Sequence, residues 1–374
     1  MKIVILYASF GGGHLKAAEA LREYYRTTYP NYEVMFIDAL KYTNPELNTL
    51  LTKTYVQIAK NIPKAWGKIY DIADQATVTD FTAVLTKTVA KKFNNLILDF
   101  NPDIILCTHP FAVDMLSILK KKDKLDAKIG LVLTDYASHQ LWLSQPETVD
   151  AFFVAHDVMV SELNLQGIDK KHVFATGIPV LNKFTTALDN TQILNDFGFD
   201  KDIFTVLFFP GGEYGLAKNN NIFKALLRIS NIQIVTVTGR NEKLKKSFEK
   251  LASHSRKKIQ ILGYTDKIPE LLSISDIAIT KPGGLTTSEC IVTNTPIVVC
   301  SPLPGQEEHN SNYILNNGLG FRIFENSNKL LTIRSIINNK ERLKQVKEMG
   351  KVLAKPNAAK DICEKMIEIY NDAK

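Results

Sequence analysis

The chain has 374 residues, of which 45% are hydrophobic and 23% are charged, as in globular proteins. This length exceeds one typical domain and suits two, each large enough for its own core. An excess of 46 Lys and Arg over 39 Asp and Glu gives a net charge of +7, which is too small to indicate a nucleic-acid-binding protein. Most of the excess lies beyond residue 185, which fits either an anionic ligand or surface there or a solvated lysine-rich face.

The apolar runs and the cysteine spacing bear on where the protein is located in the cell. No apolar stretch approaches the roughly 20 residues that span a bilayer. The first apolar run is too short for a secretory signal, so we expect a cytoplasmic protein. The four cysteines lack CxxC spacing, which predicts reduced, buried side chains and neither a disulfide framework nor a metal site: Cys107, Cys290, Cys300 and Cys363.

Short apolar runs rich in Val and Ile alternate with helical patterns along most of the chain. This alternation predicts an α/β protein with parallel sheets covered by helices on both faces. The pattern restarts near residue 203, so we predict two doubly wound, Rossmann-like domains, 1–185 and 186–374, with a functional cleft between them at the strand ends. The predicted strands lie within 2–8, 33–38, 103–109, 128–135, 151–157, 204–212, 232–239, 258–264, 276–284 and 296–302.

One interval, between Asp38 and Asp103, contains no convincing strand. Residues 45–72 place apolar side chains at helical spacings of three and four, with lysines interleaved. That pattern fits a helix lying on an anionic membrane. It also fits a helix packed on the domain core, and periodicity alone favours this second interpretation.

The first loop, Phe10 to His14, joins a predicted strand to a predicted helix. A dinucleotide fingerprint aligned on its glycines would need a small residue at Lys16, and no Gly-Lys-Ser/Thr follows, so neither nucleotide motif fits. Asp38, at the end of the second predicted strand, is weak support for a nicotinamide-cofactor site. A histidine at a helix start is disfavoured as imidazolium by the helix dipole, so we expect His14 to be neutral and able to accept a proton.

Three further loops follow predicted strands in the second half. The loop with Gly211 and Gly212 can wrap phosphate oxygens with its amides. The loop that ends at Gly284 opens a helix, whose free amides form an anion site, and Glu289 lies one turn further, where it can bind ribose hydroxyls. Gln306 follows the next strand and carries hydrogen-bonding groups suited to a sugar. The three loops are expected to converge on one cleft.

The order of these motifs resembles the MurG-type glycosyltransferases of the GT-B fold (GT28). Within them it is most similar to the diacylglycerol glucosyltransferases and monogalactosyldiacylglycerol synthases, because the chain lacks the longer GGTGGH loop and the paired glutamine of the MurG branch. The resemblance runs to about residue 320 and rests on GGGH at 11–14, TDY at 134–136, GIPV at 177–180, GRN at 239–241, GY at 263–264, KPGGLTTSE at 281–289 and PGQE at 304–307.

The resemblance implies that the C-terminal domain holds a UDP-sugar. Glu289 would bind ribose, and Gly284, Leu285 and Thr286 would lie along the nucleotide. By the same resemblance Gly211 and Gly212 would contact the diphosphate, and Arg240 and Tyr264 would contact the uracil. Gln306 and Glu307 would contact the donor sugar.

For the N-terminal domain the resemblance implies an acceptor site. His14 would be the catalytic base, with Gly12 and Gly13 making room beside it, and the segment with Asp135, His139 and Trp142 would lie on the acceptor side. Residues 45–72 fall where the lipid enzymes have a membrane-associating segment. The resemblance therefore favours a helix on the membrane over a helix packed on the domain core for this stretch.

We therefore expect an inverting transferase that moves a hexose from a UDP-sugar, UDP-glucose favoured, to diacylglycerol. It would work at the cytoplasmic face of the membrane and need neither cofactor nor metal, since no DxD-like acidic pair follows a strand. Three alternatives stay open: a MurG-like N-acetylglucosaminyltransferase with another lipid-linked acceptor, a UDP-N-acetylglucosamine 2-epimerase, and a non-catalytic UDP-sugar sensor.

Overall fold

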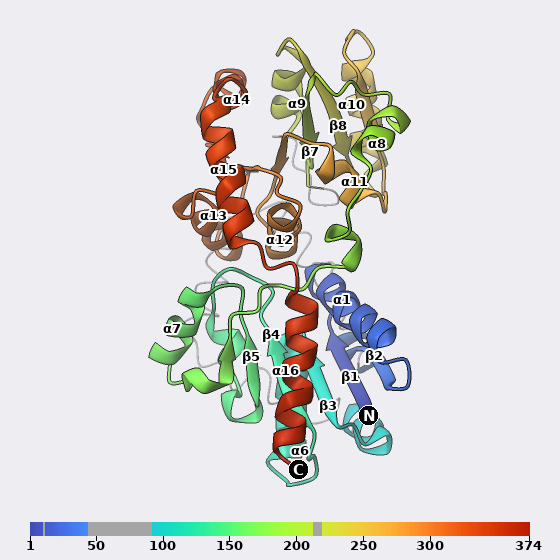
Figure 1. Ribbon diagram of the computed structural model, residues 1–374, viewed down its shortest axis with the longest axis vertical. Coiled ribbons are helices and arrows are strands. Elements are labelled where there is room, and N and C mark those ends of the chain that lie inside the picture. Colours follow the sequence, from blue (N-terminus) through green and yellow to red (C-terminus); the bar gives the residue numbers. More distant parts are fainter. Residues whose placement is uncertain (10–11, 44–91, 212–218) are drawn as a thin grey trace. The chain divides into compact units, whose positions relative to one another are not determined.

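The computed structural model describes residues 1–9, 12–43, 92–211 and 219–374 (Figure 1). The described chain forms two compact units that change over at residues 182 and 183. The N-terminal unit also takes in residues 355–374, so the chain leaves it after residue 182 and re-enters it at Lys355.

A six-stranded parallel sheet forms the centre of the N-terminal unit, in the order β2-β1-β3-β4-β5-β6. Its strands are β1 (Lys2–Tyr7), β2 (Glu33–Asp38), β3 (Ile104–Cys107), β4 (Lys128–Val132), β5 (Ala151–Phe153) and β6 (Val173–Phe174). The helices are α1 (Gly13–Thr28), α2 (Ala39–Thr43), α6 (Pro110–Lys120), α7 (Asp157–Leu165) and α16 (Ala358–Asp372), with 3₁₀ turns η1 (Gln140–Leu143), η2 (Pro146–Thr148) and η3 (Lys170–His172), and η4 (Asn182–Phe184) at the changeover.

The C-terminal unit is built around a second parallel sheet, in the order β12-β11-β10-β7-β8-β9. Its strands are β7 (Phe204–Phe208), β8 (Ile232–Val237), β9 (Ile259–Leu262), β10 (Ile277–Thr280), β11 (Ile297–Cys300) and β12 (Gly320–Ile323). The helices are α8 (Asn190–Asp196), α9 (Asn219–Leu227), α10 (Glu242–Ala252), α11 (Ile268–Ser273), α12 (Gly284–Val292), α13 (Gln306–Asn316), α14 (Lys329–Asn338) and α15 (Lys340–Leu353).

The two sheets confirm the predicted α/β fold with two doubly wound units, and all ten predicted strands are present. Two edge strands, β6 and β12, were missed by the sequence analysis. β6 has only two residues, and β12 has the sequence GFRI, in which Gly and Arg interrupt the apolar run that marks a buried strand.

The C-terminal helix α16 corrects the predicted division at 185/186. The sequence analysis placed it in the second domain, but it packs on α1 and β4 of the N-terminal unit (Figure 1). Ile362 and Met366 are fully buried there, and full burial of such side chains is worth about 1.5–3 kcal/mol each. Glu364 adds hydrogen bonds of 2.7 Å from the hydroxyls of Tyr24 and Tyr29.

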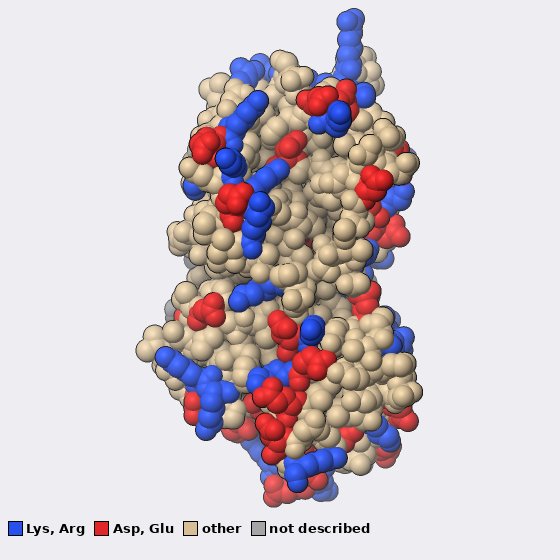
Figure 2. Space-filling model, in the orientation of Figure 1, with Lys and Arg blue, Asp and Glu red and all other residues tan. Residues whose placement is uncertain are grey.

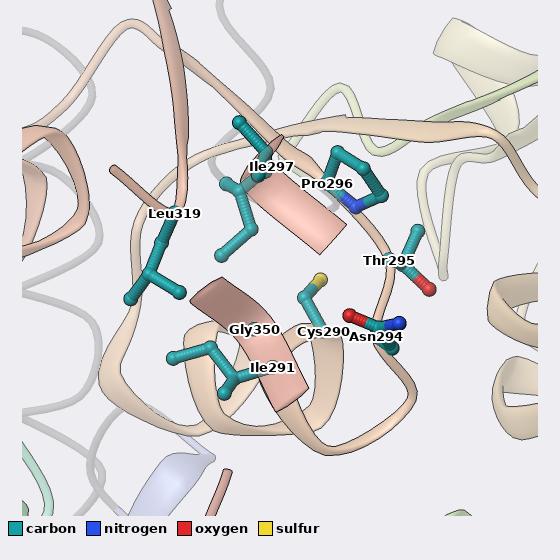
Figure 3. Close-up of a pocket in the computed structure, with 9 residues that line it drawn as sticks. Cys290, Ile291, Asn294, Thr295, Pro296, Ile297, Leu319 and Gly350 are labelled. Carbon is teal, nitrogen blue, oxygen red and sulfur yellow. The ribbon is translucent and has the colours of Figure 1, made fainter. Parts of the chain in front are cut away.

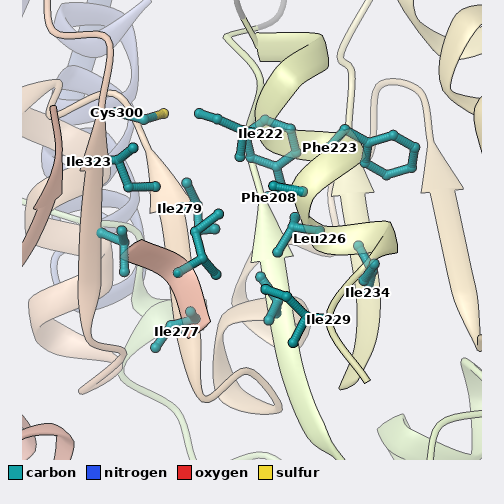
Figure 4. Close-up of a cluster of buried hydrophobic side chains, with 14 of the residues drawn as sticks. Phe208, Ile222, Phe223, Leu226, Ile229, Ile234, Ile277, Ile279, Cys300 and Ile323 are labelled. Carbon is teal, nitrogen blue, oxygen red and sulfur yellow. The ribbon is translucent and has the colours of Figure 1, made fainter. Parts of the chain in front are cut away.

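The core of the C-terminal unit lies between its sheet and helices α9 and α10 (Figure 4). Phe223 of α9 stacks on Phe248 of α10 with ring centroids 4.2 Å apart, and Phe208 of β7 packs beneath them. Because strands β7, β10 and β11 are buried on both faces, their ends are held rigidly, and the loops that follow them start from fixed positions.

The cysteines and the surface charges complete the description. All four cysteines are buried, as predicted, and none of them forms a disulfide. Figure 2 shows acidic and basic side chains interspersed on the face in view, so no continuous basic patch covers this face. Among the helices described, none combines the length and apolarity required to cross a bilayer.

Candidate active site

The junction of β1 and α1 places His14 at the carboxyl edge of the N-terminal sheet. Gly12 precedes the helix with φ of 77°, in the left-handed region that favours glycine. A Cβ built on Gly12 meets no atom of the described residues within 4 Å. The helix α1 therefore starts at Gly13 with no side-chain cap, and His14 is in its first turn.

Two threonines from neighbouring strand ends hold the His14 ring. Nδ1 lies 2.6 Å from the carbonyl oxygen of Thr108, after β3, and 3.0 Å from Oγ1 of Thr134, after β4. A carbonyl oxygen can only accept, so Nδ1 carries the proton and donates it. In the neutral ring Nε2 then has a free lone pair, which is the arrangement that a general base requires.

His14 is neutral at physiological pH, as predicted, but for a different physical reason. Burial of the ring lowers its pKa from 6.5 to about 4, and the hydrogen bond to Thr108 opposes only part of this shift. The sequence analysis attributed neutrality to the helix dipole, whereas packing around the ring is the larger cause.

A second histidine lies against the first, and the sequence analysis missed it. The ring of His109 contacts that of His14 edge to face, with centroids 4.7 Å apart. His109 follows β3 and caps α6, where its Nδ1 accepts a hydrogen bond of 3.2 Å from the amide of Phe111. The available signal was its position directly after a predicted strand, next to the strand that precedes His14 in the sheet.

The predicted acceptor-side segment also reaches His14. Trp142 of η1 is 2% exposed, and its ring centroid lies 6.0 Å from that of His14 and 5.8 Å from that of His139. Asp135 is buried at the end of β4. A hydrogen bond of 2.6 Å from Ser144 Oγ to Asp114 Oδ1 ties the segment to α6. The sheet order, with β1, β3 and β4 adjacent, is what brings these residues together.

In the C-terminal unit the predicted donor loops follow neighbouring strands. β10 lies between β7 and β11, so the loops after these strands share one edge of the sheet, as expected. Gly211 after β7 has φ of 98°, which favours glycine. Gly212 and the interval 45–72 lie outside the described residues.

Helix α12 presents its amino end at this edge. Gly283 precedes it without a side-chain cap, and a Cβ built there meets no atom within 4 Å in the part of the chain that the structure describes. The amides of Gly284, Leu285 and Thr286 belong to the first turn, which has no helical acceptors, so they are available to an anion. Glu289 is partly exposed one turn further along the same helix.

The loop after β11 is tied to α12's loop. Asn310 of α13 donates a hydrogen bond of 2.9 Å to the carbonyl of Pro282. Glu307 accepts one of 2.6 Å from the amide of Leu303, and burial raises the pKa of its carboxyl, with Lys281 opposing the rise. Glu308, the next residue, pairs with Arg322 of β12.

Arg240 and Tyr264, distant in sequence, meet in the structure. The guanidinium of Arg240 lies over the Tyr264 ring, 5.5 Å from its centroid, and Tyr264 is 69% exposed. They follow the adjacent strands β8 and β9. An exposed aromatic ring with a cation on it offers a flat surface for stacking a planar base.

Helix α12 packs closely against β11 and α15 (Figure 3). A cavity of only about 10 Å³ separates it from β11 and α15. A Cβ on Gly350 of α15 would lie 2.6 Å from Oδ1 of Asn294, so glycine is what allows α15 to approach. The carboxyl end of α12 is therefore fixed by its packing.

Comparison with known families decides the class of protein. The monogalactosyldiacylglycerol (MGDG) synthase family model matches residues 14–180, and the glycosyltransferase family 28 C-terminal domain model matches residues 213–365. The chain belongs to glycosyltransferase family 28. The match to the first model begins at His14, and the second includes α12 and both loops around it.

Curated relatives of this family 28 glycosyltransferase are full-length matches. A processive diacylglycerol beta-glucosyltransferase of Bacillus pumilus is 28% identical over 369 residues, covering 98% of this chain and 94% of the relative. The Bacillus mycoides protein of the same name is 26% identical over 373 residues, covering 98% and 93%.

Solved structures confirm the two-domain GT-B fold of the glycosyltransferase. MurG of Acinetobacter baumannii matches with a TM-score of 0.66 at 12% identity, over 98% of this chain and 99% of that one. A putative UDP-N-acetylglucosamine 2-epimerase of Listeria monocytogenes matches with a TM-score of 0.68 at 15% identity, over 100% and 97%. Transferases and epimerases thus share this fold, and the fold alone does not choose between them.

Proposed function

We propose that this glycosyltransferase transfers a hexose from a UDP-sugar, with UDP-glucose as the favoured donor, to 1,2-diacylglycerol and forms a β-glycosyldiacylglycerol. The observation that carries the proposal is the His14 site: a neutral imidazole with Nδ1 fixed as donor and Nε2 open as acceptor. The names of the two full-length relatives, both processive diacylglycerol beta-glucosyltransferases, support the acceptor.

His14 acts as the general base in this mechanism. Nε2 takes the proton of the acceptor hydroxyl while the hydroxyl oxygen attacks the anomeric carbon from the face opposite UDP, which inverts the configuration. Donation from Nδ1 to the Thr108 carbonyl holds the ring and stabilises the imidazolium as it forms.

The C-terminal unit holds the donor. Amides at the start of α12 and near Gly211 stabilise the departing diphosphate, Glu289 binds the ribose, and Arg240 with Tyr264 binds the uracil. Glu307 and Gln306 contact the sugar hydroxyls. Since amides and a helix terminus neutralise the developing charge, we propose that neither a metal nor another cofactor takes part.

The protein is proposed to work as a peripheral enzyme on the cytoplasmic face of the membrane, because its acceptor is insoluble in water. Contact with anionic lipid through residues 45–72 is part of this proposal and rests on the sequence pattern alone.

The test is mass spectrometry of lipids after incubation with diacylglycerol vesicles and, separately, UDP-glucose, UDP-galactose and UDP-N-acetylglucosamine. The proposal predicts hexosyldiacylglycerol, most rapidly from UDP-glucose. No glycolipid from any donor would refute it. Epimer formation from a UDP-sugar without lipid would instead favour the epimerase alternative.

A further inference from the structure

Two imidazoles of opposite hydrogen-bonding state lie side by side at the edge of the N-terminal sheet. The rings of His14 and His109 are inclined at 79°, with centroids 4.7 Å apart. A backbone group fixes each ring: Nδ1 of His14 faces the Thr108 carbonyl, and Nδ1 of His109 faces the Phe111 amide. Neither orientation depends on an ionisable partner.

These backbone partners set the tautomers. Because an amide can only donate, Nδ1 of His109 is the acceptor, and its ring carries the proton on Nε2. His14 has the reverse arrangement, with its proton on Nδ1. Burial, together with His14 and His139, lowers the pKa of His109 well below its usual value, so the ring is neutral. The pair therefore presents one acceptor nitrogen and one donor N–H.

Both Nε2 atoms remain available for a ligand. Among the described residues, neither makes a hydrogen bond, to the other ring or to any other group. Each residue keeps part of its surface exposed, although burial is the main reason that both rings are neutral. A hydroxyl is complementary to both atoms, because it can donate to His14 and accept from His109. An ammonium cannot accept, and an ionised phosphate cannot donate.

We propose that His109 is a catalytic residue whose Nε2–H donates a hydrogen bond to the nucleophilic hydroxyl oxygen while His14 takes the proton of that hydroxyl. The inference rests on the proposed function and deepens it, because it names the group that selects the acceptor atom. The O–H bond breaks as oxygen bonds to the anomeric carbon, and the proton moves to His14 Nε2. The bond from the anomeric carbon to diphosphate oxygen breaks with its electron pair leaving on UDP, and His109 keeps its proton.

The test replaces the donor while retaining the helix cap. In His109→Ser the hydroxyl can still cap α6, since serine is a favoured N-cap residue, but it does not extend to the position of Nε2. We expect kcat for diacylglycerol to fall about 10- to 100-fold, which is the contribution of one hydrogen bond to a group that is charged or becoming charged. UDP affinity and Tm should stay unchanged. His109→Asn, which also caps, is a second variant should the first fold poorly.

A comparison of acceptors separates catalysis from structure. Sulfur is a weak hydrogen-bond acceptor, so a diacylglycerol analogue with a thiol at the reacting position gains little from His109. The preference of the enzyme for hydroxyl over thiol should therefore fall in His109→Ser by about the factor lost in kcat. A purely structural role would slow both acceptors equally. The matched control is His172→Ser, because a backbone group also holds Nδ1 of His172, in this case the carbonyl of Asp150, but before β6 at the opposite sheet edge.

Two failures are distinguishable. If the wild-type enzyme forms no glycolipid, the proposed function fails. If it forms glycolipid and His109→Ser matches it in kcat and in hydroxyl preference, only the role of His109 is overturned.

Discussion

The acid limb of the pH profile tests whether His14 is the base. Burial lowers its pKa from 6.5 to about 4, and at about 1.4 kcal/mol per unit this opposes protonation of the ring by about 3 kcal/mol. A base acts only when unprotonated, so kcat/KM for the lipid should stay level from about pH 8 to about pH 5. Below about pH 4 it should fall tenfold per unit.

Trp142→Ala perturbs this pKa directly. The indole packs 6.0 Å from the His14 ring and is itself buried, so its removal admits water to the imidazole. The pKa should then rise, which moves the acid limb from about pH 4 towards the ordinary histidine value of about 6.5. The assay is the initial rate of glycolipid formation in vesicles at constant ionic strength.

Glu307 can also produce an acid limb, because burial raises the pKa of its carboxyl. Its titration belongs to the donor site and should change KM for the UDP-sugar, which separates it from His14. A wild-type limb near pH 6.5 in kcat/KM for the lipid, or a limb that Trp142→Ala leaves in place, would refute the reasoning about His14.

Further predictions concern the donor, the C-terminal helix and metals. Glu289→Ala should weaken UDP binding by about 1.5–3 kcal/mol in calorimetry if its carboxylate binds the ribose, and unchanged affinity would remove that role. Glu364→Ala loses two tyrosyl hydrogen bonds and should lower the free energy of unfolding by about 1–3 kcal/mol. The control Glu368→Ala, on the exposed side of α16, should leave the free energy of unfolding unchanged. Equal losses of this free energy in the two variants would contradict the packing of α16 on the N-terminal unit. Excess chelator should leave the transfer rate unchanged, and loss restored by Mg²⁺ would contradict the metal-free mechanism.

Much of the fold could be predicted because buried parallel strands have continuous apolar sequences. The ten longer runs all became strands, but GFRI of β12 has no such run. The destination of α16 could not be predicted, because an amphipathic pattern shows that a helix has a buried face and not which sheet covers it. Close packing of Met366 on Gly130 of β4, where a Cβ would lie 2.7 Å from its sulfur, is visible only in the structure.

The site shows the same division. His14 stood out because three glycines precede it at a strand-to-helix turn. His109 is an ordinary histidine in sequence, and only the adjacency of β1 and β3 places it against His14. The neutrality of His14 was predictable from its place at a helix start, but burial has the larger effect, and the side chains against the ring, Thr134 and Trp142, come from other loops.

The central claim is that His14 removes the proton of the acceptor hydroxyl, and His14→Ala tests it most directly. UDP binding and glycolipid formation are measured on the same preparation. The account predicts normal UDP affinity and a transfer rate lowered by about two to four orders of magnitude, the usual contribution of a general base. Near-normal turnover in His14→Ala would contradict it.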